Sequence, residues 1–221
     1  MPRTGARYSV LLFDLDGTLV DSAAGVVKAV RHAFEAIGQR VPDEQNIVAN
    51  IGRPLRDFPA RLGYDLDEER RQEFVSRYRA FYSAHCTEDT TVFPGVRTGL
   101  GRLRESGLRL AVVTTKIQEQ AEKVTQALGL VQYFESISGW SDGQKMKPDP
   151  EPILRTLDRL GTRPDQALMI GDSEQDILAA RAARVDSCAC LYGYRAPSVL
   201  LELCPNWTIR RFPELLRLVL L

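Results

Sequence analysis

The sequence predicts an α/β fold in which a doubly wound, Rossmann-like parallel sheet carries an inserted α-helical cap domain. Two observations support it. Short apolar runs alternate with amphipathic helical patterns along most of the chain, and this alternation stops over one helical stretch after the first run. Alternating strands and helices are typical of a parallel sheet covered by helices on both faces. The 221 residues suffice for one domain with a sizeable insertion, or for two small domains.

Apolar runs of four to six residues mark the strongest expected strands, because a strand covered on both faces is apolar on both sides. They are residues 8–13, 108–113 and 167–170. Weaker candidates are residues 134–138, 188–192 and 207–209. Helices are expected from Pro94-Gly95 to Gly107, over 117–128, from Pro148 to Gly161, and over 174–183 and 215–221.

The stretch from about residue 22 to residue 86 contains helical patterns and no good strand. Its expected helices cover residues 23–37, 54–62 and 66–85. We therefore predict a core of residues 1–16 and 92–221, and a helical cap domain with its hinges over residues 17–91.

Composition excludes several classes of function. Lys plus Arg and Asp plus Glu both number 29, so no global basic field would attract nucleic acid. No apolar run approaches the roughly 20 residues that span a bilayer. The N-terminal residues 1–7 lead into only a short apolar stretch, unlike a secretory signal. We expect a cytoplasmic protein, monomeric or homodimeric, with no nucleic-acid or membrane partner.

Polar side chains follow the expected strands, where ligands bind in open α/β sheets. Asp14-Leu15-Asp16-Gly17-Thr18 follows the first run, and Thr114-Thr115-Lys116 follows the second. Gly171-Asp172-Ser173, with Asp176 one helical turn on, follows the third, and Lys147 lies in a further loop before a helix. Four separate loops would thus bring carboxylates, hydroxyls and ammonium groups to one edge of the sheet.

These residue types suit phosphoryl transfer. Asp14 would be the nucleophile, and Asp16 would protonate the leaving alcohol and later deprotonate water. Clustered carboxylates need a cation, and Mg²⁺ prefers oxygen ligands, here Asp14, Asp172 and the Asp16 backbone carbonyl.

The remaining residues of these loops have supporting tasks in this interpretation. Thr114 and Lys147 would donate to phosphate oxygens, and Gly17 would let the backbone approach the phosphate. Asp176 would orient Lys147 or metal-bound water. Ser173, beside Asp172, could also simply cap the helix that follows.

The sequence closely resembles the haloacid dehalogenase superfamily. Asp14-Leu15-Asp16-Gly17-Thr18-Leu19 is similar to its first motif, and Thr114 to its second. Lys147-Pro148-Asp149-Pro150 resembles its third motif, and Gly171-Asp172-Ser173 to Asp176 its fourth. The resemblance covers essentially the whole chain and is greatest to the phosphoglycolate phosphatase-like and pyrophosphatase-like branch, although many phosphoglycolate phosphatases have Asn in place of Thr115.

Substrate recognition is expected from two loops. The resemblance implies that the Gly52-Arg53 loop of the cap reaches into the active site, and that Thr115 and Lys116 contact substrate. Arg53 could bind a carboxylate or second phosphate, or could pair with Asp57 at helical spacing. Lys116 could contact substrate or be a loop charge. The mixed charges of residues 61–79 suggest a solvated helical face.

The expected function is a Mg²⁺-dependent phosphatase that acts on a small phosphate monoester, phosphoglycolate-like, through a phospho-aspartyl intermediate on Asp14. Alternatives in the same family are an inorganic pyrophosphatase and a sugar-phosphate or nucleotide phosphatase. Alternatives from other classes are a catalytically silent binding module and a phospho-accepting signalling domain.

Overall fold

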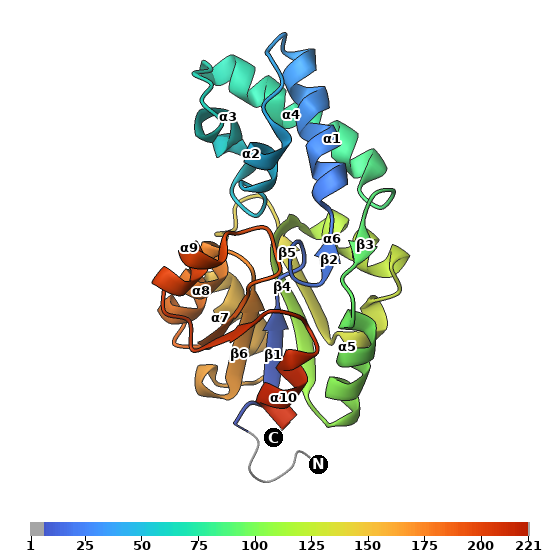
Figure 1. The fold of residues 1–221 in the computed structure, drawn as a ribbon, viewed down its shortest axis with the longest axis vertical. Coiled ribbons are helices and arrows are strands. Elements are labelled where there is room, and N and C mark those ends of the chain that lie inside the picture. The colour runs from blue at the N-terminus through green and yellow to red at the C-terminus, as the bar shows by residue number, and fades with distance from the viewer. Residues whose placement is uncertain (1–6, 221) are drawn as a thin grey trace.

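Six parallel strands form the central sheet of the computed structural model, which describes residues 7–220 (Figure 1). They are β1 (Val10–Phe13), β4 (Arg109–Ile117), β5 (Ser136–Trp140), β6 (Ala167–Gly171), β7 (Asp186–Cys190) and β8 (Trp207–Ile209), in the order β5-β4-β1-β6-β7-β8. The chain moves outward from β1 to β5 and then returns to β6, so the winding reverses between β1 and β6. This confirms the predicted doubly wound sheet and places its ligand-binding crevice beside β1.

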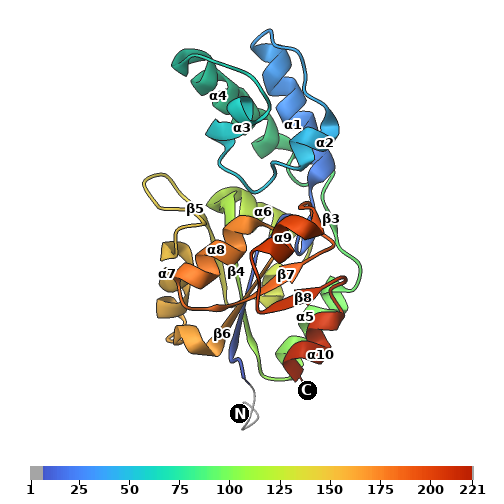
Figure 2. The ribbon, with the colours of Figure 1, turned by 60° about the vertical axis from the view of Figure 1, so that its left-hand side comes forward.

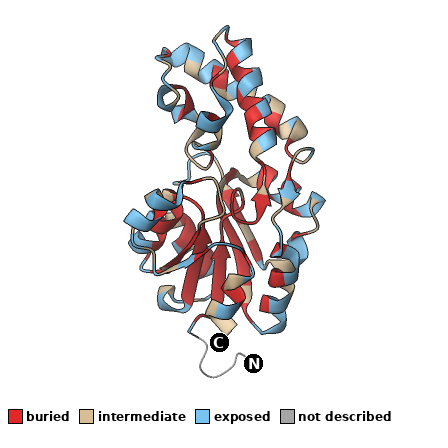
Figure 3. Ribbon diagram, viewed as in Figure 1, coloured by how far each residue is buried: buried red, intermediate tan, exposed pale blue. Residues whose placement is uncertain are grey.

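Both faces of the sheet are buried, which explains why its strands read as continuous apolar runs (Figure 3). Leu11 and Phe13 point to one face, and Val10 and Leu12 to the other. The first face packs on α5 (Val96–Glu105) and α10 (Glu214–Leu220), and the second on α7 (Glu151–Arg159) and α8 (Glu174–Ala182). The helices α6 (Gln118–Ala127) and α9 (Pro197–Glu202) complete the core. The last residue of the expected C-terminal helix lies outside the described residues.

Four helices form a separate group beyond the carboxyl ends of the strands (Figures 1 and 2). They are α1 (Ala23–Ala36), α2 (Glu44–Val48), α3 (Phe58–Arg61) and α4 (Glu68–His85). An antiparallel pair of short strands, β2 (Val20–Asp21) and β3 (Thr91–Val92), joins this group to the sheet. We call residues 22–90 the helical cap; the exact domain boundaries stay a prediction.

The helix expected over residues 54–62 is split into a 3-10 turn at Leu55–Asp57 and α3. Pro59 explains the split, because proline favours the first turn of an α-helix and has no N–H to bond further back. Within the cap, Phe34 of α1 packs against Phe74 of α4, with ring centroids 4.9 Å apart. None of the helices between residues 7 and 220 is long and apolar enough to cross a membrane.

Candidate functional site

A buried lysine lies between carboxylates that follow two different strands, β1 and β6. Asp14 directly follows β1, and Phe13, the last residue of β1, is in register with both Val112 and Ile170. The Nζ of Lys147 lies 3.1 Å from Asp14 Oδ1 and 2.5 Å from Asp176 Oδ1, and it also donates to the Val113 carbonyl at 2.7 Å. The sheet therefore brings residues from distant parts of the chain to one edge.

One of the two carboxylate oxygens of Asp14, the candidate nucleophile, accepts no hydrogen bond from the described residues, 7–220. The backbone N–H of Leu15 donates to Asp14 Oδ1 at 2.8 Å, and Lys147 contacts the same oxygen. Across residues 7–220, no hydrogen bond reaches Asp14 Oδ2. That oxygen is left for chemistry with a ligand.

Burial and like charge act on these carboxyl groups together. Burial and the charge of Asp176 raise the pKa of Asp14 to about 7, against the opposing effect of Lys147. Burial, followed by the charges of Asp14 and Asp176, raises the pKa of Asp172 well above its usual range. Burial alone would lower the pKa of Lys147, but the two carboxylates outweigh it and raise the pKa. A further cation is needed to keep both Asp14 and Asp172 ionised.

The donor set fits a hard divalent cation. One carboxylate oxygen from each of Asp14, Asp172 and Asp176 lies within 4.8 Å of the others, and all three residues are buried. Asp176 is largely committed elsewhere, since its Oδ2 accepts from the N–H and the hydroxyl of Ser173 in a capping box. Asp14 and Asp172 would therefore be the principal side-chain ligands of Mg²⁺, which prefers oxygen donors.

Glycines let other loops approach these carboxylates. Gly17 has φ = 80°, and a Cβ there would lie 2.2 Å from Asp172 Oδ2. A Cβ on Gly193 would lie 2.2 Å from the Cβ of Asp172. Thr18 and the backbone N–H of Tyr194 donate to the two oxygens of Asp172, at 3.3 and 2.8 Å. Asp172 is thus held from both sides.

Asp16 is held by a different lysine. The Nζ of Lys116 lies 3.0 and 2.9 Å from the two Asp16 oxygens, and it donates to the Tyr82 hydroxyl of α4 at 2.7 Å. Ser22 donates to Asp16 Oδ1 at 2.5 Å. The side chain of Lys116 is 4% exposed, so it is a buried partner of Asp16 and not a solvated loop charge. Tyr82 was not foreseen from the sequence.

The two threonines expected in a loop after the second strand lie inside β4, near its carboxyl end, because this strand continues to Ile117. Thr114 is buried, and its hydroxyl accepts from the backbone N–H of Lys116 at 3.2 Å. The Thr115 hydroxyl donates to the Gly52 carbonyl at 3.2 Å. This bond joins β4 to the cap loop that the sequence singles out.

Arg53 pairs with Glu174, the first residue of α8, and not with Asp57. Glu174 also binds Arg195, whose Nε lies 2.5 Å from Glu174 Oε2. Arg195 donates in addition to the carbonyls of Ala49 and Ile51, the latter at 2.9 Å. Two core side chains, the Glu174 carboxylate and the Arg195 guanidinium, therefore connect the cap loop 49–53 to the core.

The loop after β7 supplies contacts that sequence reasoning missed. The Tyr194 hydroxyl accepts from the Ser22 N–H at 2.7 Å and donates to Asp21 Oδ1 at 3.0 Å. With Arg195 on loop 49–53 and the Tyr194 N–H on Asp172, residues 192–195 touch the hinge, the cap loop and a metal-ligand candidate. No local spacing links these partners, which lie more than 100 residues apart except for Asp172.

The chain is similar over nearly its full length to known proteins. A family model described as haloacid dehalogenase-like hydrolase matches residues 11–190. The chain is 33% identical over 213 residues to pyrophosphatase PpaX of Halalkalibacterium halodurans, covering 96% of this chain and 97% of that one. It is 34% identical over 210 residues to the phosphoglycolate phosphatase of Aquifex aeolicus, covering 95% and 96%.

Solved structures of similar proteins also superpose on nearly the whole chain. A structure described as a predicted phosphoglycolate phosphatase from Haemophilus somnus superposes with a TM-score of 0.89 at 25% identity, covering 97% of this chain and 99% of that one. A haloacid dehalogenase-like family hydrolase from Streptococcus pneumoniae superposes with a TM-score of 0.88 at 30% identity, covering 96% and 98%.

Proposed function

Because this chain belongs to the haloacid dehalogenase-like hydrolase family and is a phosphatase, we propose that it hydrolyses a small phosphate monoester through a phospho-aspartyl intermediate on Asp14, with Mg²⁺ as cofactor. The observation that carries the proposal is the convergence of Asp14, Asp172, Asp176 and Lys147 at the carboxyl ends of β1 and β6. Asp14 offers a carboxylate oxygen for attack, the three aspartates can hold a metal ion, and Lys147 supplies a buried positive charge. Phosphoryl transfer uses all three.

Asp14 is the proposed nucleophile. Its Oδ2 accepts no hydrogen bond from residues 7–220, while its Oδ1 is fixed by Leu15 and Lys147. Attack by Oδ2 on phosphorus forms the acyl phosphate, and the bond to the leaving oxygen breaks. A fixed carboxylate loses little freedom in reaching this geometry.

Asp16 is the proposed acid and base. It would donate a proton to the departing alkoxide, then accept one from the water that cleaves the acyl phosphate. Its contacts with Lys116 and Ser22 orient the carboxyl group at the edge of the cavity below the cap.

Lys147 and Thr114 are proposed to donate to the phosphoryl oxygens, where negative charge is offset in the transition state. Asp176 holds Lys147 in position through its 2.5 Å contact. When bound by Asp14, Asp172 and the Asp16 carbonyl, Mg²⁺ would supply positive charge that lowers the repulsion between nucleophile and phosphate. Gly17 would let the backbone approach the phosphate.

The substrate we propose is a phosphoglycolate-like monoester, with inorganic pyrophosphate as the second candidate. One relative is described as a phosphoglycolate phosphatase and another as a pyrophosphatase. Gly52, Arg53, Thr115 and Lys116 border the cavity that such a substrate would enter. A cytoplasmic location and the absence of a nucleic-acid partner, both predictions from the sequence, would fit a small-molecule substrate, and either a monomer or a homodimer would suit it.

The test is phosphate release from phosphoglycolate, pyrophosphate and sugar and aryl phosphates, with Mg²⁺ or with chelator. We expect Mg²⁺-dependent release by the wild type and a loss of at least about a thousandfold in Asp14→Asn. Asp165→Asn, which alters an exposed carboxylate, serves as the matched control. Full turnover by a folded Asp14→Asn variant would refute the proposed nucleophile, and release that survives chelation would refute the cofactor.

A further inference from the structure

A cavity of about 680 Å³ lies between the cap and the loops at the carboxyl ends of the strands. Asp16, Thr115 and Lys116 belong to its wall, so the cavity is continuous with the proposed active site. At about 30 Å³ per molecule, its volume corresponds to roughly twenty waters. Cavities in this range take ligands considerably larger than glycolate or phosphate.

The charged side chains of the cavity wall are mostly basic. One is acidic, Asp16, and five are basic: Arg53, Arg56, Arg71, Arg79 and Lys116. Four of the five have a carboxylate partner. Arg79 takes part in no ion pair within the described part of the chain, residues 7–220. Arg56 and Arg71 share one carboxylate, Glu68, and Arg79 is the cation of this wall that contacts none in that part of the chain.

The position of Arg79 on α4 explains its lack of a partner. Side chains three and four residues apart are neighbours on a helix, and those around Arg79 are Val75, Ser76, Tyr82 and Ser83. Arg77, by contrast, faces solvent and pairs with Glu73 four residues before it. The solvated face expected for residues 61–79 therefore does not include Arg79, which is half-buried and lines the cavity. Arg79 also lines a smaller neighbouring hollow with Glu119, Glu122 and Asp142, and within residues 7–220 it forms no ion pair with any of the three.

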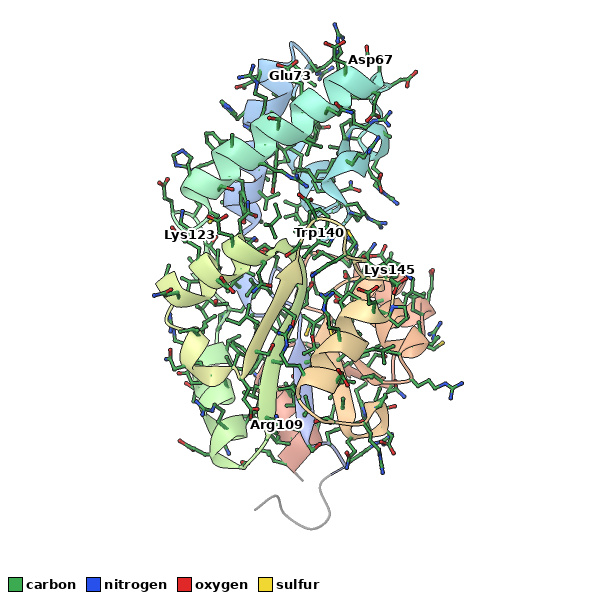
Figure 4. The ribbon with its side chains drawn as sticks, turned by 180° about the vertical axis from the view of Figure 1, so that it is seen from behind. Asp67, Glu73, Arg109, Lys123, Trp140 and Lys145 are labelled. Carbon is green, nitrogen blue, oxygen red and sulfur yellow. The ribbon has the colours of Figure 1, made fainter. Side chains whose placement is uncertain are left out.

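An aromatic ring of the core holds this guanidinium in place. The Arg79 guanidinium carbon lies 5.5 Å from the centre of the Trp140 ring, a cation–π contact. Trp140 ends β5, and its Nε1 donates to the Gln144 carbonyl at 2.9 Å, which fixes the ring. Figure 4 shows Trp140 where the cap meets the sheet. The Nε of Arg79 is buried without a hydrogen-bond acceptor, so its guanidinium has unused donor capacity.

The rest of the wall is largely apolar. It includes Val26, Ile51, Phe58, Val75, Tyr78 and Tyr82. A ligand lying along these side chains would bury an apolar or aromatic body between two charged ends.

We propose that Arg79, held over Trp140, binds a second anionic group of the substrate, and that an apolar body separates this group from the phosphate that is cleaved. The inference rests on the proposed function and narrows its substrate class. It favours monoesters that are acidic like phosphoglycolate but have a larger body, over phosphoglycolate itself and over the second candidate, pyrophosphate. The second anion is a carboxylate or a phosphate-like group, since a guanidinium binds both in the same bidentate manner.

The experiment compares kcat/KM for phenyl and biphenyl phosphates that carry hydrogen, a carboxylate or a non-hydrolysable phosphonate at the far para position. The readout is the ratio of the acidic ester to its neutral parent. Arg79→Ala should lower this ratio roughly tenfold to a hundredfold, mainly through KM, because the remote contact is a charge-assisted hydrogen bond. Arg79→Lys should retain part of it, and Arg77→Ala, on the solvent face of the same helix, should retain all of it.

Thermal unfolding of each variant shows whether it is folded, and Arg79→Gln replaces Arg79→Ala if the latter is not. Whichever acid, carboxylate or phosphonate, gives the larger kcat/KM ratio over the neutral parent is the anion that Arg79 prefers. A wild-type ratio near one for both acids, a ratio unchanged by Arg79→Ala, or an equal fall in Arg77→Ala would overturn the inference while leaving the phosphatase proposal intact. No hydrolysis of any of these esters, acidic or neutral, would instead overturn the proposed function, and the inference with it.

Discussion

The two buried lysines of this site contact different carboxylates. Lys147 bridges Asp14 and Asp176, whereas Lys116 holds Asp16. Both lysines are buried, and each contacts a different one of the two proposed catalytic aspartates, which are therefore stabilised separately. The proposed nucleophile and the proposed acid can therefore be altered one at a time.

The pKa of Asp14 gives a prediction for magnesium binding. Burial and Asp176 raise this pKa from 3.8 to about 7, so the folded metal-free protein binds a proton that the unfolded chain has lost. The stabilisation from that proton is complete below the unfolded pKa and is lost as pH rises through the folded one. Mg²⁺ needs ionised carboxylates, so its effect should grow over the same pH range.

We expect saturating Mg²⁺ to raise Tm by roughly 5–10 °C at about pH 8, and by much less at about pH 5. Differential scanning fluorimetry with and without Mg²⁺ measures this. Asp172→Asn should remove the rise, and Asp165→Asn should keep it. An equal rise at both pH values, or a rise that persists in Asp172→Asn, would contradict the assigned metal ligands.

The proposed role of Asp16 predicts a dependence on the leaving group. Asp16→Asn should slow hydrolysis of an alkyl phosphate by about 10²- to 10⁴-fold, since an alkoxide needs a proton to leave. An aryl phosphate should lose less, because a phenolate leaves more readily. The difference is measured as kcat/KM on one ester of each kind, because this ratio reports the steps up to loss of the leaving group and not the later hydrolysis of the acyl phosphate. The exposed cap variant Asp57→Asn is the control. Equal losses on both esters would argue against an acid at this position.

Sequence reasoning at this scale succeeds where a residue follows a strand. Asp14 and Asp172 each do so, and the structure brings them to one sheet edge. Thr114 was expected to follow a strand as well, but β4 continues to Ile117 and contains it. It misses Tyr82 and Arg195, because their partners lie 34 and up to 146 residues away and no local spacing reveals them. Arg79 had a local indication, the absence of acidic residues at helical spacing.

Two loops act together at the scale of elements. Residues 49–53 of the cap meet residues 192–195 of the core through Arg195, which binds Glu174 and two cap carbonyls. The same core loop donates to Asp172 through the Tyr194 N–H. The position of the cap loop is thereby connected to a proposed metal ligand.

Removing this guanidinium should loosen the cap loop. Arg195→Ala leaves the buried Ile51 carbonyl, the carbonyl of the exposed Ala49 and part of Glu174 without this donor. We expect a loss of about 1–3 kcal/mol in unfolding free energy. Amide hydrogen exchange over residues 49–53 should quicken, while exchange in α1 stays as in the wild type. Arg163→Ala, which removes an exposed arginine, should change neither quantity. Unchanged exchange in loop 49–53 would show that Arg195 does not restrain it.

Elements with a clear apolar pattern were predictable, and the shortest ones were not. The six strands of the sheet lie within a few residues of their expected positions. The strands β2 and β3 have two residues each, and α2 and α9 have five and six. Such lengths are too short to show a helical or strand period, and tertiary contacts define them.

At the scale of the molecule, the fold class follows from the alternation of strands and helices, and family membership agrees with it. How far the cap lies from the sheet could not be predicted, because that spacing depends on contacts such as Lys116 with Tyr82 and Arg79 with Trp140. These contacts, and not the chain order, define the cavity in which a substrate would lie.

The central claim is a covalent phosphoryl group on Asp14, and the most direct measurement is mass spectrometry of the acid-quenched enzyme during turnover. Asp16→Asn should accumulate the intermediate, because the water that cleaves it has lost its base. We expect one added phosphoryl group on the peptide that contains Asp14, present with substrate and Mg²⁺ and absent from Asp14→Asn. Turnover without any labelled peptide, or a label on another residue, would contradict the account.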